Sequence, residues 1–176
     1  MIRVYYDNVI VSGRIVADLG PAEVAAVQMI ERAHELGVIK RVTSRQAWRE
    51  QEGAPEPLRA TLHAARGDLS VVASDHVVLG AAALDGLYGT AATFPLVTDI
   101  VDQALFDDLK ALGLRDSDAK HLMYAAHNDC VRFLTLDHHF LKRKRALEAR
   151  CGAIIILKPS ELVCELIAAG LIHDAV

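Results

Sequence analysis

Four acidic residues stand at the ends of predicted strands or near the starts of predicted helices. Asp7 follows the first apolar run, and Asp137 ends a later run that favours strand formation. Asp118 lies in the first turn of a predicted helix, and Glu50 lies in the helix after the second predicted strand. In open parallel sheets, ligands bind in the crevice beyond the carboxyl ends of the strands. We therefore expect these acids to share one crevice.

The chemistry that this acidic set could do depends on a cation, because carboxylates that face one another repel. Ligation by oxygen atoms alone suits Mg²⁺ or Mn²⁺. Hydrolysis of a phosphodiester bond is a typical reaction of one or two such ions. A simpler interpretation is also open, in which Asp118 only stabilises a helix start and Asp137 is an ordinary turn residue.

Apolar runs alternate with helical patterns along most of the chain, which predicts an α/β fold. Strands are expected at residues 2–6, 38–43, 131–136 and 153–157. Helices are expected between Pro21 and Gly37, after Ser44, at residues 58–66 and 97–112, before the Asn128-Asp129 turn, at residues 141–150, and from Pro159 onward. This alternation predicts a single domain over residues 1–176, built as a three-layer α/β/α sandwich with a mostly parallel sheet.

Some local features are expected from single residues. Ser117 or Asp116 is expected to cap the helix of the third predicted acid, and residues 8–13 are expected to turn away from the first strand. Residues 69–73 fit either a strand or a continued helix. The stretch 80–93, rich in alanine and glycine, has no assigned element.

Composition limits the broad class of protein. The chain has 176 residues, of which 52% are hydrophobic and 24% are charged, as in a globular domain. Its net charge of −4 does not suit a general nucleic-acid coat, although a local basic patch could still bind nucleic acid. Cys130, Cys151 and Cys164 are widely spaced, which indicates buried thiols in a reducing compartment and neither a disulfide framework nor a zinc site.

No targeting or membrane segment is expected. A strand begins immediately at the N-terminus, so no signal peptide is predicted. The apolar stretch 77–97 is interrupted by Asp85, three glycines and a proline, and we do not expect it to span a membrane. The expected location is the cytoplasm.

Four short motifs, in order along the chain, resemble the PIN-domain ribonucleases, a family that includes the toxins of bacterial toxin–antitoxin pairs. The motifs are Val-Tyr-Tyr-Asp-Asn-Val-Ile-Val-Ser-Gly at 4–13, Asp-Ala-Lys-His-Leu-Met-Tyr-Ala-Ala at 118–126, Phe-Leu-Thr-Leu-Asp-His-His-Phe at 133–140 and Ile-Ile-Ile-Leu-Lys-Pro-Ser-Glu-Leu at 154–162. The resemblance spans the chain apart from residues 53–96. It implies a PIN-like fold and a Mg²⁺- or Mn²⁺-dependent endoribonuclease.

The resemblance also implies roles for particular residues. It matches the family's metal-binding acids and the hydroxyl residue before the last acid to Asp7, Glu50, Asp118, Asp137 and Thr135. Glu52 competes with Glu50 as the second acid, although Ser44 stands at the family's usual distance before Glu50.

One departure from the family pattern leaves two alternatives open. Asp7 is followed by Asn8 and Val9, where the family commonly has Thr or Ser and then Asn, so Asn8 or Ser12 would have to supply the polar group. The departure supports a PIN-like binding or scaffold module without catalysis. A doubly wound phosphatase or receiver is the other alternative: a phosphatase would want an aspartate at Val9, and a receiver would want a late lysine such as Lys158.

A basic run and several aromatic or imidazole side chains are further candidates. The run comprises Lys142, Arg143, Lys144 and Arg145, and it either holds the RNA backbone or forms a solvated helix face. His121, one helical turn after Asp118, either lines the crevice or is structural. His138 and His139 are interpreted as strand neighbours that point apart and not as metal ligands, and Trp48 as a core residue.

The resemblance implies partners as well as a reaction. RNA is the expected substrate, and a small antitoxin protein is expected to cover the crevice, with an arginine facing the carboxylates. A homodimer is left open. No membrane partner is expected.

Overall fold

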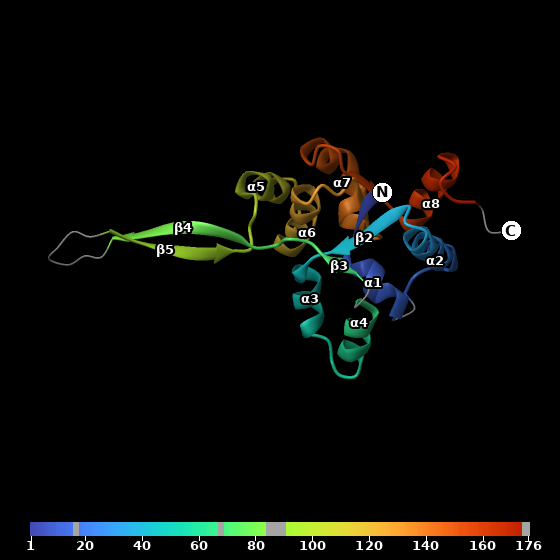
Figure 1. The fold of residues 1–176 in the computed structure, drawn as a ribbon, viewed down its shortest axis with the longest axis horizontal. Helices are drawn as coiled ribbons and strands as arrows, with labels where there is room; N and C mark the ends of the chain where they lie inside the picture. Colours follow the sequence, from blue (N-terminus) through green and yellow to red (C-terminus); the bar gives the residue numbers. More distant parts are fainter. Residues whose placement is uncertain (16–17, 67–68, 84–90, 174–176) are drawn as a thin grey trace.

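The computed structural model describes residues 1–15, 18–66, 69–83 and 91–173, and it confirms the prediction of an α/β sandwich. Five parallel strands form one sheet in the order β3-β2-β1-β6-β7. The strands are β1 (Ile2–Tyr6), β2 (Ile39–Thr43), β3 (Ser70–Val71), β6 (Arg132–Leu134) and β7 (Ile155–Leu157). Helices flank this sheet on both faces and give the predicted three layers (Figure 1).

The helices divide into two layers and one pair at the end of the sheet. One layer holds α1 (Asn8–Ile15), α2 (Pro21–Glu35) and α8 (Pro159–Ala168); the other holds α5 (Gln103–Ala111), α6 (Asp116–His127) and α7 (His138–Arg150). The remaining pair is α3 (Arg45–Glu52) and α4 (Leu58–Arg66). Because α3 packs against α6 while α4 packs against α1, this pair connects the two layers.

Two separate hydrophobic cores follow from the alternation of side chains along the strands. Tyr5 and Phe133 point into the core under α5, α6 and α7, where their rings stack with centroids 5.3 Å apart. Their neighbours Tyr6 and Leu134 point into the opposite core under α1, α2 and α8. Successive strand residues face opposite sides of a sheet, so a strand buried on both faces reads as a continuous apolar run.

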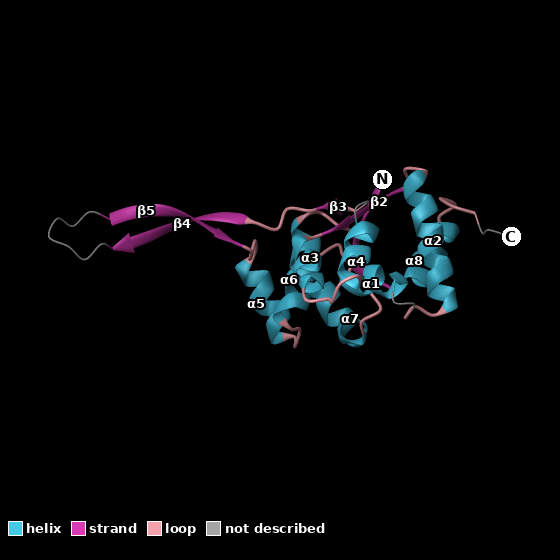
Figure 2. Cartoon of the chain, turned by 90° about the horizontal axis from the view of Figure 1, so that it is seen from below, coloured by secondary structure: helices cyan, strands magenta, loops and turns pink. Residues whose placement is uncertain are grey.

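A long hairpin projects from this body (Figures 1 and 2). Its strands are β4 (His76–Ala83) and β5 (Ala91–Thr98), which pair antiparallel with His76 opposite Thr98. These strands cover residues 80–83 and 91–93 of the stretch to which no element was assigned, and residues 84–90 lie outside the described part of the chain. The strand at β3 also resolves the choice left open for residues 69–73.

The two ends of the hairpin are held by charged side chains of α3 and α6. Arg45 contacts Asp75 at 2.6 Å, just before β4, and Arg49 contacts Asp99 at 2.6 Å, just after β5. Lys120 also contacts Asp99, at 2.7 Å. The base of the hairpin is therefore fixed to the helices that carry Glu50 and Asp118.

Several sequence expectations about helix ends were wrong. The helix expected at 97–112 begins only at Gln103, because β5 extends to Thr98 and the Asp102 carboxylate accepts the Leu105 N–H at 2.9 Å as a cap. The expected turn at residues 8–13 is instead α1. Ser117 and Asp116 lie inside α6, whose first flanking residue makes no side-chain cap.

The cysteines only partly follow the prediction. Cys130 and Cys151 are buried, and this burial raises the pKa of each thiol to about 12. Cys164 is exposed on α8, which corrects the expectation that all three are buried. No helix in the described ranges is both long and apolar enough to cross a lipid bilayer.

Replacing residues 76–98 by Asn-Gly should leave the body folded. Asp75 and Asp99 flank the first cross-strand pair of the hairpin, so a two-residue turn can join them. A two-stranded hairpin is marginally stable in isolation and contributes little to the body. We expect a cooperative thermal transition within about 4 °C of the parent's, since about 1 kcal/mol shifts the midpoint of a domain of this size by about 2–4 °C. A broad, non-cooperative melt would show that the hairpin is part of the folding unit.

Candidate active site

The residues that follow three neighbouring parallel strands all lie at one edge of the sheet. Asp7 follows β1 and precedes α1; Ser44 follows β2 and precedes α3; Asp137 follows β6 by three residues and precedes α7. Because β2, β1 and β6 are adjacent, these connections lie side by side. Each helix also directs its N-terminal N–H groups toward this edge, where negative charge is favoured.

Asp7 is the most deeply buried acid of the predicted set, with an exposed fraction of 6%. Its Oδ2 accepts the Thr135 hydroxyl at 2.6 Å, and its Oδ1 accepts the Asn8 N–H at 2.7 Å. The Thr135 oxygen in turn accepts the Asp137 N–H at 3.0 Å. Thr135 therefore ties the carboxylate after β1 to the backbone after β6.

Glu50 is held by a histidine from another helix and not by a second acid. His121 on α6 is buried, and its Nε2 lies 3.0 Å from Glu50 Oε1 on α3. The other ring nitrogen, Nδ1, lies 2.7 Å from the Tyr5 hydroxyl of β1. That hydroxyl lies 2.6 Å from Ser44 Oγ, so β1, α3, α6 and the connection between β2 and α3 meet in this one chain of contacts.

The contacts in this chain allow two proton arrangements, which differ in the charge of His121. If the Tyr5 hydroxyl donates to Ser44, Nδ1–H donates to the Tyr5 oxygen and both ring nitrogens carry a proton. If the Ser44 hydroxyl donates to Tyr5, Tyr5 donates to Nδ1 and the ring is neutral, and in both cases Nε2–H donates to the Glu50 carboxylate. The nearby acids favour the first arrangement, so we assign the ring as an imidazolium.

The electrostatics of these groups agree with that assignment. Burial alone would lower the pKa of His121, but the hydrogen bond to Glu50 and the charges of Asp7, Glu50 and Asp118 outweigh it and raise that pKa. Burial works against the charged form of Glu50 too, and the contact with His121 reverses the effect, so the pKa of Glu50 is lowered.

For Asp7, burial dominates and raises the pKa of the carboxyl, although the charge of His121 and the bonds from Thr135 and Asn8 oppose the shift. Burial therefore destabilises the ionised form of Asp7 more than its neighbours stabilise it.

Asp118 and Asp137 occupy the margins of this arrangement. Asp118 is half-buried in the first turn of α6, accepts the Ser117 hydroxyl at 3.2 Å and acts on His121 through its charge. Asp137 caps α7, with Oδ1 accepting the His139 N–H at 2.7 Å. Asp118 thus lies at a helix start as expected, whereas Asp137, expected at the end of a strand, lies three residues after β6 and caps a helix.

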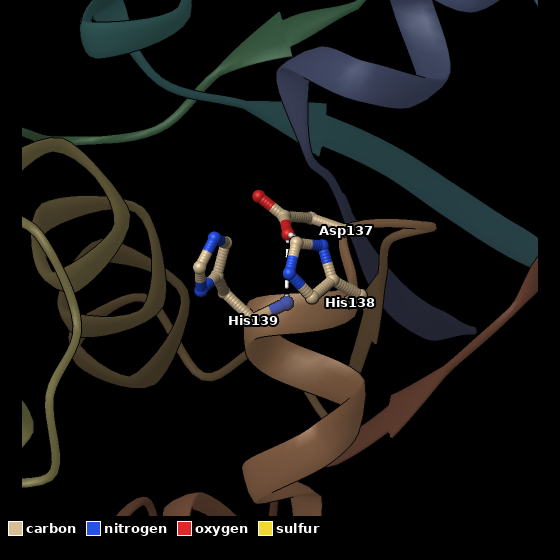
Figure 3. A group of neighbouring side chains, drawn as sticks. All are labelled: Asp137, His138 and His139. Atoms are coloured by element: carbon tan, nitrogen blue, oxygen red, sulfur yellow. Dashed lines mark hydrogen bonds and ion pairs between the residues drawn. The ribbon is translucent and has the colours of Figure 1, made fainter.

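The two histidines after Asp137 were wrongly placed on a strand. They open α7, and their rings lie 4.0 Å apart instead of pointing away from each other. Figure 3 shows both beside the Asp137 carboxylate at the first turn of the helix. Among the described residues, Asp137, His138 and His139 are the one group of three whose ligand atoms all lie within 4.8 Å, so Asp7, Glu50 and Asp118 do not approach one another that closely.

Of the two residues expected to supply a polar group after Asp7, Asn8 contacts the helix that carries Glu50. The side-chain oxygen of Asn8 accepts from Gln51 Nε2, and hydrogen bonding from Asn8 also lowers the pKa of Glu50. Asn8 therefore couples α1 to α3, whereas the Ser12 hydroxyl only bonds back to the Asn8 carbonyl at 2.9 Å. Glu50 contacts the buried His121, whereas Glu52 lies in the wall of a groove with Arg45 and Arg49, so Glu50 is the acid that faces the site.

No protein-family model matches the chain, and searches of curated proteins and of solved structures find no match either. The likeness to PIN-domain ribonucleases thus rests on the short sequence motifs alone.

The stability of the metal-free protein should depend on pH through His121. A histidine whose pKa rises on folding contributes stability that is fully present below its unfolded pKa of about 6.5 and is lost as pH rises through the folded value. In chelator, His121→Gln should cost about 1–3 kcal/mol at pH 6 and progressively less toward pH 9.

Thermal melts across this range test the sign. His127→Gln, an exposed histidine of the same helix, is the matched control and should show a small, constant difference. A cost for His121→Gln that stays constant with pH would contradict the imidazolium assignment.

Proposed function

We propose that this chain is a Mg²⁺- or Mn²⁺-dependent endoribonuclease with a PIN-like acidic site. The observation that carries the proposal is the buried Asp7 carboxylate, fixed by Thr135 at the carboxyl edge of a parallel sheet. Glu50 and Asp118 act on the same buried histidine, and Asp137 is joined to Asp7 through Thr135. This is the ligand edge of open α/β folds.

The chemistry of the donor set suits a hard divalent cation, because its ligand atoms are all carboxylate oxygens. No three of these carboxylates lie within 4.8 Å of one another in the described residues, so their side chains would have to turn toward a bound ion. Burial makes ionised Asp7 costly, so a bound cation would stabilise it. The residues that would hold the ion are Asp7, Glu50, Asp118 and Asp137, whose carboxylate oxygens suit Mg²⁺ or Mn²⁺. When bound, such an ion supplies Lewis-acid stabilisation and a water of lowered pKa.

The chain's own residues orient these ligands. Thr135 and the Asn8 N–H fix both oxygens of Asp7, so its carboxylate cannot rotate freely. His121 keeps Glu50 ionised and holds it in one position. Such orientation reduces the entropy lost when a substrate phosphate and its nucleophile are aligned.

Substrate binding is assigned to α7, which begins directly after Asp137. Lys142 and Arg145 are exposed on this helix. Arg143 is half-buried against the turn at Gly113, where an added Cβ would lie 3.2 Å from its Nη2, and Lys144 lies 3.9 Å from Glu161. We therefore propose that, within the basic run, Lys142 and Arg145 make the main contacts with phosphate.

A non-catalytic module is the alternative, and one observation favours it. The imidazolium of His121 already compensates Glu50 within the protein, so this acid does not need a metal for charge balance. A small inhibitory partner protein belongs to the ribonuclease proposal only if the chain is a toxin. Metal binding and cleavage separate the two candidates.

The Asp7→Asn variant tests the metal site. Asparagine keeps the shape and can still bond Thr135 and Asn8, while it removes the buried charge, so in chelator the variant should melt at or above the parent's temperature. Mn²⁺ should raise the parent's melting temperature strongly and the variant's much less, because the metal binds only the native site. Cleavage of RNA should require Mn²⁺ or Mg²⁺ and be lost in the variant.

The control is Asp107→Asn, an exposed acid of α5, which should keep the parent's metal response and cleavage. Equal metal-induced shifts in Asp7→Asn and the parent would remove Asp7 from the ligand set. Cleavage that persists in excess chelator would reject metal dependence altogether.

The basic run can be tested through salt. Replacing Lys142 and Arg145 by alanine should weaken RNA binding and reduce the slope of log affinity against log salt by about 1.4, since each phosphate contact to a single strand contributes about 0.7. The matched control replaces Arg32 and Lys158, two exposed cations elsewhere on the surface. An unchanged slope in the first variant would show that these cations form a solvated helix face.

A further inference from the structure

The sequence interpretation of Trp48 as a core residue was wrong, and its correction reveals a groove. Trp48 is 44% exposed on α3 and lies in the wall of a cavity of about 690 Å³. Arg45 and Arg49 line the same wall, because residues three and four apart share one face of a helix. The opposite wall is the chain from Val71 to Asp75, between β3 and the hairpin.

We infer that this groove binds one nucleotide of single-stranded RNA, with the base stacked on Trp48 and the phosphate held by Arg45 or Arg49. The choice of RNA as the ligand rests on the ribonuclease function proposed above. The groove and the candidate active site are built on the same helix, since Glu50 is two residues from Trp48. Its volume lies within the range of about 300–1,000 Å³ typical of small-ligand pockets.

The aromatic side of the groove suits a base. The Trp48 ring stacks on the His63 ring of α4, with centroids 6.1 Å apart and planes at 28°, so the indole is supported by a second ring. An indole face attracts any nucleobase by stacking, with little dependence on sequence. The apolar residues Val71 and Val72 stand in the facing wall.

The two arginines suit a phosphate because they are oriented in advance. Arg45 uses Nη1 for Asp75 and Arg49 uses Nη1 for Asp99, each at 2.6 Å. A guanidinium carries five N–H donors, so each arginine retains donors for a ligand while its ion pair limits its motion. Asp75 also lies in the groove and can accept from the amino group of a base.

The chain provides its own reporter, because Trp48 is its only tryptophan. Titrating the full chain in EDTA with a single-stranded uridine pentanucleotide and with an adenosine pentanucleotide should quench the Trp48 emission saturably. The inference requires quenching at the same concentrations that saturate binding measured by the anisotropy of a labelled oligonucleotide. Emission that stays unchanged at saturating RNA would overturn it.

Variants separate stacking from general charge attraction. Trp48→Ala should weaken RNA binding about fivefold to 150-fold, as expected for the loss of one stacked base, and Trp48→Phe should restore much of it. Leu36→Ala, another exposed apolar residue, is the control and should bind like the parent. Equal affinities of Trp48→Ala and Trp48→Phe would overturn the inference, and melting curves would show whether each variant is folded.

The outcomes distinguish this inference from the proposed ribonuclease. Asp7→Asn should lose cleavage but keep the RNA-dependent quenching, because Asp7 does not line the groove. If RNA quenches the parent's emission but the parent shows no Mn²⁺-dependent cleavage, the inference about the groove stands and the ribonuclease proposal is rejected. If Trp48→Ala cleaves RNA with the same Michaelis constant as the parent, the ribonuclease proposal stands and the inference about the groove is rejected. A groove covered by a co-purified protein, with no quenching by RNA, would assign it to protein binding and overturn the inference.

Discussion

The buried chain of contacts through His121 connects the elements that make the site. A single imidazolium joins Tyr5 of the central strand, Ser44 at the start of α3 and Glu50 further along that helix. Without it, Glu50 would be a partly buried carboxylate that lacks the opposite charge of the ring, and β1 would contact α3 through the Tyr5–Ser44 bond but no longer through Glu50. Breaking a buried pair by removing one partner typically costs several kcal/mol. The position of Glu50 depends on this contact, whereas Asp7 is fixed by Thr135 and Asn8.

Most of the fold could be predicted from the sequence because its strands are buried on both faces. Val4, Tyr5 and Tyr6 form a continuous apolar run, which only a strand covered on two sides requires. Glycines at helix ends were equally informative: Gly37 and Gly113 both have positive φ after a helix. The hairpin was missed because its strands contain five alanines, a glycine and a proline, which have low strand propensity, and because the two strands form a separate sheet of their own.

The acids of the candidate site could be predicted from the sequence, but the residues that contact them could not. Asp7, Asp118 and Asp137 could be placed because strand ends and helix starts are visible in the sequence. The role of His121 could not be predicted, because Tyr5 and Ser44 are remote from it in the chain and their contacts arise from packing. Trp48 was misjudged because one aromatic residue on a short helix has no periodic pattern that shows which face is exposed. His138 and His139 were misread because the strand ends before Thr135 and a helix follows Asp137.

The charge balance at the edge of the sheet bears on the metal ion proposed above. Three carboxylates raise the pKa of His121, namely those of Asp7, Glu50 and Asp118. Asp137 adds a fourth carboxylate, which keeps its charge although one of its oxygens caps α7. With the ring charged, four carboxylates and one imidazolium would leave three negative charges at this edge, so His121 alone does not balance the acids. A divalent cation held among them would reduce the remaining repulsion, which is the physical reason for placing the proposed metal here.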